Sequence, residues 1–109
     1  MIGKTVTVTV DRPLGSRHPE YRDMIYPVNY GYVAGVTGGD GEAQDAYILG
    51  VTEPVESFTG RVFAIIHRKN DSEDKWVVVP EGCRLTADTI RQSTYFQEQY
   101  FIIEIEVET

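Results

Sequence analysis

Alternating polar and apolar residues mark the first strand of the chain. The segment KTVTVTVDR, residues 4–12, has a valine at every second position from Val6 to Val10, and this period of two predicts a half-buried strand. Apolar runs predict further strands at 24–36, 45–51, 61–68 and 75–80. The run at 24–36 is interrupted by a proline and two glycines, so we expect it to bend. Five strands at short spacing favour a small closed barrel or a sandwich.

One helix is expected after these strands. Thr86 is a suitable N-cap, Asp88 lies in the first turn, and apolar residues recur among polar ones to about residue 98. The tail FIIEIEVET, residues 101–109, alternates again and predicts a final strand. The 109 residues are the length of one domain, so we treat 1–109 as a single unit.

Composition narrows the function classes. No apolar run is long enough to span a membrane, so we expect no membrane partner. The only cysteine is Cys83, which excludes an internal disulfide and fits a reducing cytoplasm. The net charge of −7 disfavours binding to nucleic acids and to anionic membranes.

Two acidic turns carry the candidate chemistry. The first, DGEAQD at 40–45, contains Asp40, Glu42 and Asp45, whose carboxylates are hard oxygen ligands suited to Mg²⁺, Mn²⁺ or Ca²⁺. The second, NDSEDK at 70–75, lies between two predicted strands. Each turn taken alone is better explained as a solvated acidic turn. In a small barrel, however, two such turns can meet at one rim and share metal ions.

A third motif, YPVNYGY at 26–32, is unusually rich in tyrosine. Tyr26 and Tyr30 are four residues apart and would share a face of a strand. Their rings are suited to a core, and their hydroxyls are suited to phosphate contacts near bound metals. Arg12 follows the first strand and offers a bidentate contact to phosphate.

In this order and spacing, the motifs resemble those of the soluble family I inorganic pyrophosphatases over residues 8–80. YPVNYGY is the most specific match, and the ten-residue step from Tyr30 to Asp40 agrees without a gap. FQEQYF, 96–101, is more loosely similar to the helix that closes the family's active site. The resemblance implies a mainly β (α+β) fold: a five-stranded OB-like barrel, here with one C-terminal helix near 86–98. It also implies Mg²⁺-dependent hydrolysis of pyrophosphate, with Mn²⁺ as an alternative cofactor, by a metal-activated water.

The resemblance assigns roles residue by residue. Asp40 and Asp45 match metal ligands, and Glu42 stands where the family has the aspartate often assigned as general base. Glu73 matches a further metal ligand, or Asp74 does if the alignment shifts by one residue. Positions that contact or border the phosphates match Arg12, Tyr26, Tyr30, Lys75 and Tyr100.

Several positions depart from the family's pattern. Glu42 is one methylene longer than aspartate, Arg68 stands where a metal-binding aspartate is expected, and Phe101 stands where a phosphate-binding lysine is expected. The chain also begins after the family's early strand, which supplies a glutamate and a lysine. The alternative function is therefore a non-catalytic domain that binds a divalent metal or a phosphorylated ligand. A nucleic-acid-binding barrel is a third hypothesis, which the negative charge disfavours. Without the family's early strand, one edge of the barrel would be unpaired, and an unpaired edge would favour a homo-oligomer.

Overall fold

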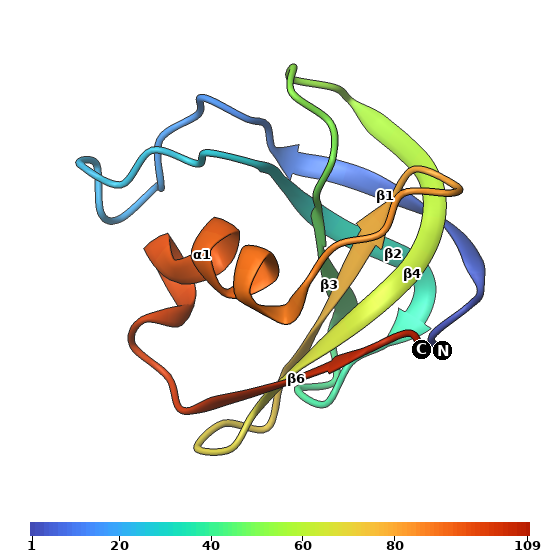
Figure 1. Cartoon of the computed structure of the whole chain (residues 1–109). Helices are drawn as coiled ribbons and strands as arrows, with labels where there is room; N and C mark the ends of the chain where they lie inside the picture. Colours follow the sequence, from blue (N-terminus) through green and yellow to red (C-terminus); the bar gives the residue numbers. More distant parts are fainter.

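The computed structural model describes all residues 1–109 and contains six strands and one helix (Figure 1). In chain order these are β1 (Thr5–Arg12), β2 (Asn29–Thr37), β3 (Ala43–Ile48), β4 (Ser57–Arg68), β5 (Asp74–Val79), α1 (Ala87–Glu98) and β6 (Ile103–Val107). The helix begins after the N-cap Thr86, whose hydroxyl accepts a hydrogen bond from the backbone N–H of Thr89 at 3.1 Å. The predicted helix and its cap are therefore confirmed.

Five strands close into a barrel in the order β1-β2-β3-β5-β4, with β4 pairing back to β1. All neighbouring pairs are antiparallel except β3 and β5, which are parallel. The sixth strand, β6, pairs with β4 outside the barrel. The predicted five-stranded barrel and the tail strand are confirmed. The barrel closes within one chain, so it has no open edge that would favour self-association. The homo-oligomer stays a prediction.

Two predicted strand boundaries were wrong. Residues 24–28 are not part of β2, which begins at Asn29, because they pair with a loop segment instead. Tyr26 donates its backbone N–H to the carbonyl oxygen of Ser16 at 2.9 Å, and Arg17 forms a bridge with Ile25. β4 begins at Ser57 rather than at residue 61, because its first residues pair with β1.

The core has two parts because strand residues alternate between faces. One set of buried side chains comes from all five barrel strands and fills the interior: Val8, Val33, Ala46, Ile48, Val62, Trp76 and Val78. The other set packs between the barrel and α1: Tyr47, Leu49, Phe63, Ala64, Ile66, Val77, Val79 and Ile90. The helix therefore covers one outer face of β3, β4 and β5, between the β1–β2 loop and β6 (Figure 1). With only 12 residues, α1 is too short to cross a bilayer.

Asn29 joins the loop after β1 to the loop after β3. Its fully buried side chain accepts hydrogen bonds from the backbone N–H groups of Leu14 at 2.9 Å and Val55 at 3.2 Å. The Nδ2 atom donates to the carbonyl oxygen of Glu53 at 2.9 Å. Two residues later, a Cβ atom on Gly31 would lie 1.9 Å from the carbonyl oxygen of Thr9. Two positions of the YPVNYGY motif thus serve the fold.

We predict that Asn29→Ala lowers the free energy of unfolding by about 3 kcal/mol, because it leaves buried backbone groups of two loops without partners. Asn70→Ala is the matched control, since Asn70 is exposed and its side-chain oxygen accepts a single bond, from the N–H of Ile102. Urea unfolding of both variants measures the difference. Equal losses would show that the buried bonds of Asn29 do not organise the loops.

Candidate active site

The two acidic turns meet at one rim of the barrel, as expected from the sequence. A Cβ atom on Gly39 would lie 1.9 Å from the carbonyl oxygen of Ser72, so only glycine permits this close approach. The buried side chain of Gln44 donates from Nε2 to the carbonyl oxygen of Asp74 at 2.7 Å. These two contacts, one of Gly39 with Ser72 and one of Gln44 with Asp74, bring the carboxylates of the two turns together.

Asp40 and Glu73 form a carboxylate pair across this rim. Their carboxyl groups lie within hydrogen-bonding reach of each other, and this contact lowers the pKa of Asp40. The backbone N–H of Glu42, 3.0 Å from Asp40 Oδ1, acts in the same direction. Partial burial, followed by the contact with Asp40, raises the pKa of Glu73. A cation between the two groups would allow both to be ionised.

Lys75 links the two turns from the inside. Its buried Nζ atom lies 2.5 Å from Asp45 Oδ2 and 3.4 Å from Glu73 Oε2. The same atom lies 5.7 Å from the centre of the Tyr30 ring. Burial, followed by the nearby charge of Asp45, raises the pKa of Tyr30, so its hydroxyl is protonated at neutral pH. The rim thus combines the three carboxylates of Asp40, Asp45 and Glu73 with an ammonium group and a phenol donor.

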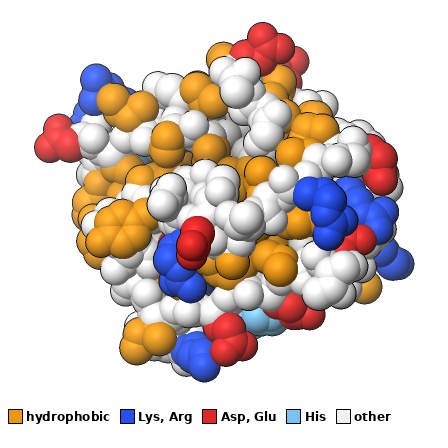
Figure 2. Space-filling model, viewed as in Figure 1, with side chains coloured by type: hydrophobic (Ala, Val, Ile, Leu, Met, Phe, Trp, Pro, Cys, Tyr) orange, Lys and Arg blue, Asp and Glu red, His pale blue; other side chains and the backbone are white.

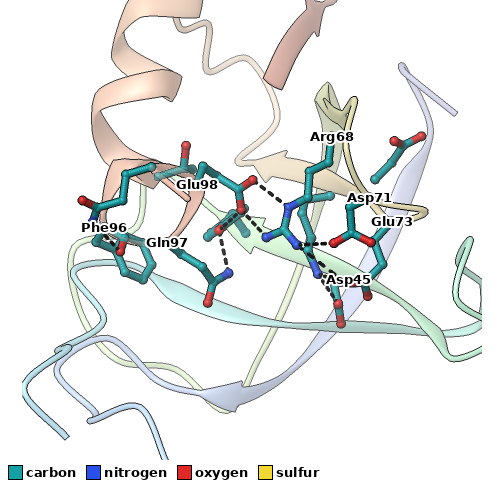
Figure 3. A network of polar contacts seen from close by, with 12 residues as sticks. Asp45, Arg68, Asp71, Glu73, Phe96, Gln97 and Glu98 are labelled. Carbon is teal, nitrogen blue, oxygen red and sulfur yellow. Dashed lines mark hydrogen bonds and ion pairs between the residues drawn. The ribbon is translucent and has the colours of Figure 1, made fainter. Parts of the chain in front are cut away.

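Arg68, at the end of β4, occupies the centre of the network (Figure 3). Its Nε and one terminal nitrogen donate to the two carboxylate oxygens of Glu98 at 2.9 and 2.6 Å. The other terminal nitrogen lies 3.4 Å from Asp71 Oδ2 and 3.7 Å from Glu73 Oε2. The guanidinium carbon is 3.7 Å from the centre of the Phe101 ring. A fixed cation, covered by an aromatic ring, therefore stands where the resemblance expects a metal-binding carboxylate.

The network continues along α1. The Tyr47 hydroxyl donates to Glu98 Oε2 at 2.6 Å and accepts from Gln97 Nε2 at 2.7 Å. The Tyr26 hydroxyl donates to Gln97 Oε1 at 3.2 Å. Burial, followed by the charge of Glu98, raises the pKa of Tyr47, so it remains a donor. This chain of contacts connects the β1–β2 loop to the acidic rim through the helix.

The sequence did not predict the roles of Tyr47, Gln97 and Glu98. They lie in a strand and a helix whose patterns indicate packing alone. The available signal was charge: Arg68 ends an apolar strand and Glu98 lies in an amphipathic helix, and a buried charge requires a partner. Sequence spacing could not show that Arg68 and Glu98 pair with each other.

A cavity of about 420 Å³ opens beside the network. Two of its lining residues are the buried cations Arg68 and Lys75, and most of the others are aromatic or apolar. The full set is His18, Tyr21, Met24, Tyr30, Arg68, Lys75, Gln97, Tyr100 and Phe101. Of the predicted phosphate contacts, Tyr30, Lys75 and Tyr100 therefore border the cavity. The side chain of Tyr100 is largely exposed at this border.

The remaining predicted residues lie further away. Arg12 approaches the hydroxyl of Tyr26, and neither lines the cavity. Glu42 is exposed, and its carboxylate makes no hydrogen bond or ion pair. Asp74 faces away from the rim and contacts His67 Nδ1 at 3.2 Å. Of the two aligned alternatives, the structure brings Glu73 rather than Asp74 to the acidic rim.

The donor set fits one hard divalent cation better than a cluster of them. No three acidic, histidine or cysteine side chains converge closely enough to hold a metal ion. Asp40 and Glu73 do converge, and their oxygen atoms suit Mg²⁺ or Mn²⁺ with water completing the shell. Asp45 lies next to this pair but is bound to Lys75.

We predict that Arg68→Met lowers the free energy of unfolding by about 3–5 kcal/mol, because it leaves Glu98 buried without its cation. Adding Glu98→Gln to this variant should recover part of the loss, since the amide can still bond Tyr47. Urea unfolding of the single and double variants measures the recovery. A double variant less stable than Arg68→Met would contradict a direct pair.

Comparison with solved structures identifies the architecture. The chain is similar to an inorganic pyrophosphatase from Ehrlichia chaffeensis, with a TM-score of 0.73 and 17% identity over 98% of this chain and 88% of that one. The inorganic pyrophosphatase structure from Coxiella burnetii has a TM-score of 0.67 and 16% identity, over 98% of this chain and 86% of that one. The one from Neisseria gonorrhoeae has a TM-score of 0.63 and 20% identity, over 98% of this chain and 82% of that one.

Sequence comparison adds no closer relative. No protein-family model and no curated protein sequence matches the chain. At these low identities, structural similarity concerns the path of the backbone rather than the chemistry of the site. The fold is that of the family I inorganic pyrophosphatases, in a strongly divergent form.

Proposed function

We propose that the protein hydrolyses inorganic pyrophosphate to two phosphates in a Mg²⁺-dependent reaction. The observation that carries this proposal is the meeting of the two acidic turns, which places Asp40 and Glu73 together beside Lys75. Solved structures of similar fold include inorganic pyrophosphatases, which supports the same class of substrate.

In this proposal Asp40 and Glu73 hold one divalent cation with water completing its shell, and Asp45, which is paired with Lys75, lies beside it. When bound, such a cation polarises phosphoryl oxygens and lowers the pKa of a coordinated water. Mg²⁺ is the expected ion, and Mn²⁺ has the same preference for oxygen ligands. One ion is proposed rather than several, because Arg68 already supplies a fixed positive charge at the rim.

The chain's own residues orient the substrate. In this proposal Lys75 and the protonated hydroxyl of Tyr30 donate to phosphate oxygens, and Arg12, Tyr26 and Tyr100 make the further contacts. Water forms a bond to one phosphorus while the bond from that phosphorus to the bridging oxygen breaks. The electron pair leaves with the second phosphate, and Glu42 accepts the proton of the water.

A non-catalytic role is the second candidate. It is favoured by one observation: Lys75 and Arg68 already neutralise Asp45, Glu73 and Glu98, so the site has fewer free carboxylates than a multi-metal centre needs. In that case the same rim would bind a divalent cation or a phosphorylated ligand without turnover. Absence of phosphate release from a protein that still binds Mn²⁺ would select this alternative.

We predict that purified protein releases phosphate from pyrophosphate when Mg²⁺ is present and not when a chelator removes it.

Asp40→Asn and Glu73→Gln should each weaken Mn²⁺ binding by roughly tenfold or more, since the loss of even an outer partner of a metal ligand has an effect of that size. Calorimetric titration with Mn²⁺ and a phosphate-release assay measure the two effects. Asp88→Asn is the control, because Asp88 is an exposed acid on α1. Unchanged Mn²⁺ affinity in both rim variants would remove the proposed centre.

Glu42→Gln separates proton transfer from metal binding. If Glu42 accepts the proton, turnover should fall on the order of 100-fold, the typical contribution of a general base. Mn²⁺ affinity should stay near that of the unmodified protein, because Glu42 is not among the proposed ligands. A variant with full turnover, or with Mn²⁺ affinity lost to the same extent as in Asp40→Asn, would contradict this role.

A further inference from the structure

The cavity beside the acidic rim has a lining that pyrophosphate does not require. Pyrophosphate consists of two phosphate groups and has no apolar surface. Yet the cavity holds about 420 Å³, and six of its lining residues are aromatic or apolar: His18, Tyr21, Met24, Tyr30, Tyr100 and Phe101. Cavities of this size and lining accommodate organic ligands, which are fixed by a few polar groups.

The lining is divided into a charged end and an aromatic end. Lys75 and Arg68 lie at the charged end, where both contact Glu73 of the acidic rim. Tyr21, Met24 and Tyr100 belong to the outer end, because they also line a neighbouring surface hollow. A ligand that fills the cavity therefore meets cations at one end and aromatic rings at the other.

Two tyrosines at the outer end are strongly exposed. Tyr21 is 64% exposed and Tyr100 is 67% exposed, although both border the same cavity. Hydrophobic side chains are also visible on the face that α1 occupies (Figure 2). Exposed aromatic rings beside a cavity are typical of surfaces that stack on a flat ligand.

Tyr21 is held in place by its own loop. His18 Nδ1 accepts hydrogen bonds from the backbone N–H groups of Glu20 at 3.1 Å and Tyr21 at 3.2 Å. The His18 and Tyr21 rings lie 5.1 Å apart, and the His18 backbone N–H donates to the carbonyl oxygen of Met24 at 2.8 Å. A loop whose backbone is ordered before binding loses little entropy when a ligand stacks on its side chain.

We propose that the site takes a nucleoside diphosphate or triphosphate, with its phosphates at Lys75 and the acidic rim and its base between the rings of Tyr21 and Tyr100. This inference rests on the proposed function for the phosphate end and extends it at the aromatic end. Aromatic rings stack on any base, so the class is a nucleotide rather than one particular base. Hydrolysis of the nucleotide would follow the same step as that of pyrophosphate. Water adds to a phosphorus of the anhydride, and the bond from that phosphorus to the leaving phosphate breaks.

The test compares two non-hydrolysable ligands that share one anionic group. Methylenediphosphonate is the analogue of pyrophosphate, and α,β-methylene-ADP carries the same group attached to a nucleoside. In calorimetric titrations with Mg²⁺ present, α,β-methylene-ADP should bind about tenfold tighter or more, as expected for one stacked base. Equal affinities would overturn the proposal. So would equally tight binding of geranyl methylenediphosphonate, which has an apolar chain and no aromatic ring.

Tyr21→Ala should remove most of this preference and leave the affinity for methylenediphosphonate unchanged. Tyr95→Ala is the matched control, since Tyr95 is an exposed tyrosine of α1 that does not line the cavity. A Tyr21→Ala variant that keeps the full preference would overturn the assignment of the aromatic end.

The outcomes separate this inference from the proposed function. If methylenediphosphonate binds with Mg²⁺ and the nucleotide has no advantage, the inference fails and the proposed function stands. If the nucleotide binds with its full preference but no phosphate is released from pyrophosphate, the inference stands and the proposed function fails.

Discussion

The buried ion pair between Arg68 and Glu98 is the interaction on which the site depends. It joins the end of β4 to the last residue of α1, and through Glu73 it reaches the acidic rim. A buried pair of this kind adds little net stability, because both charges lose their hydration. Loss of one partner is costly, however, so the pair allows few positions of the helix relative to the barrel. The position of the helix in turn sets the cavity, since Gln97 lines it directly.

The same pair changes the electrostatics expected from the fold. A guanidinium stands where the resemblance to pyrophosphatases expects a carboxylate, and Phe101, in place of an expected lysine, covers it. The rim therefore has a fixed positive charge of its own beside its carboxylates. The apolar cover of Arg68 also contributes to the aromatic lining of the cavity.

Local patterns in the sequence predicted much of the fold. The period of two in residues 4–12 and the Thr86 cap are determined by neighbouring residues, and both were confirmed. The segment 24–28 was predicted wrongly, because its hydrogen bonds go to residues 15–18 rather than to a strand. The pairing of Arg68 with Glu98 could not be predicted, because it joins residues 30 apart and depends on how the helix docks. The choice between Glu73 and Asp74 required the structure, which shows that Asp74 binds His67 on the other side.

In the proposed function, the turns at 38–45 and 70–75 share one divalent cation at the rim of the barrel. Titration of ¹⁵N-labelled protein with Mn²⁺ tests it directly, because the ion broadens the resonances of nearby backbone N–H groups. If the two turns share the ion, the resonances of both turns broaden together at low Mn²⁺ concentration, and excess Mg²⁺ restores them. Broadening confined to one turn, or to acidic residues elsewhere on the surface, would contradict it.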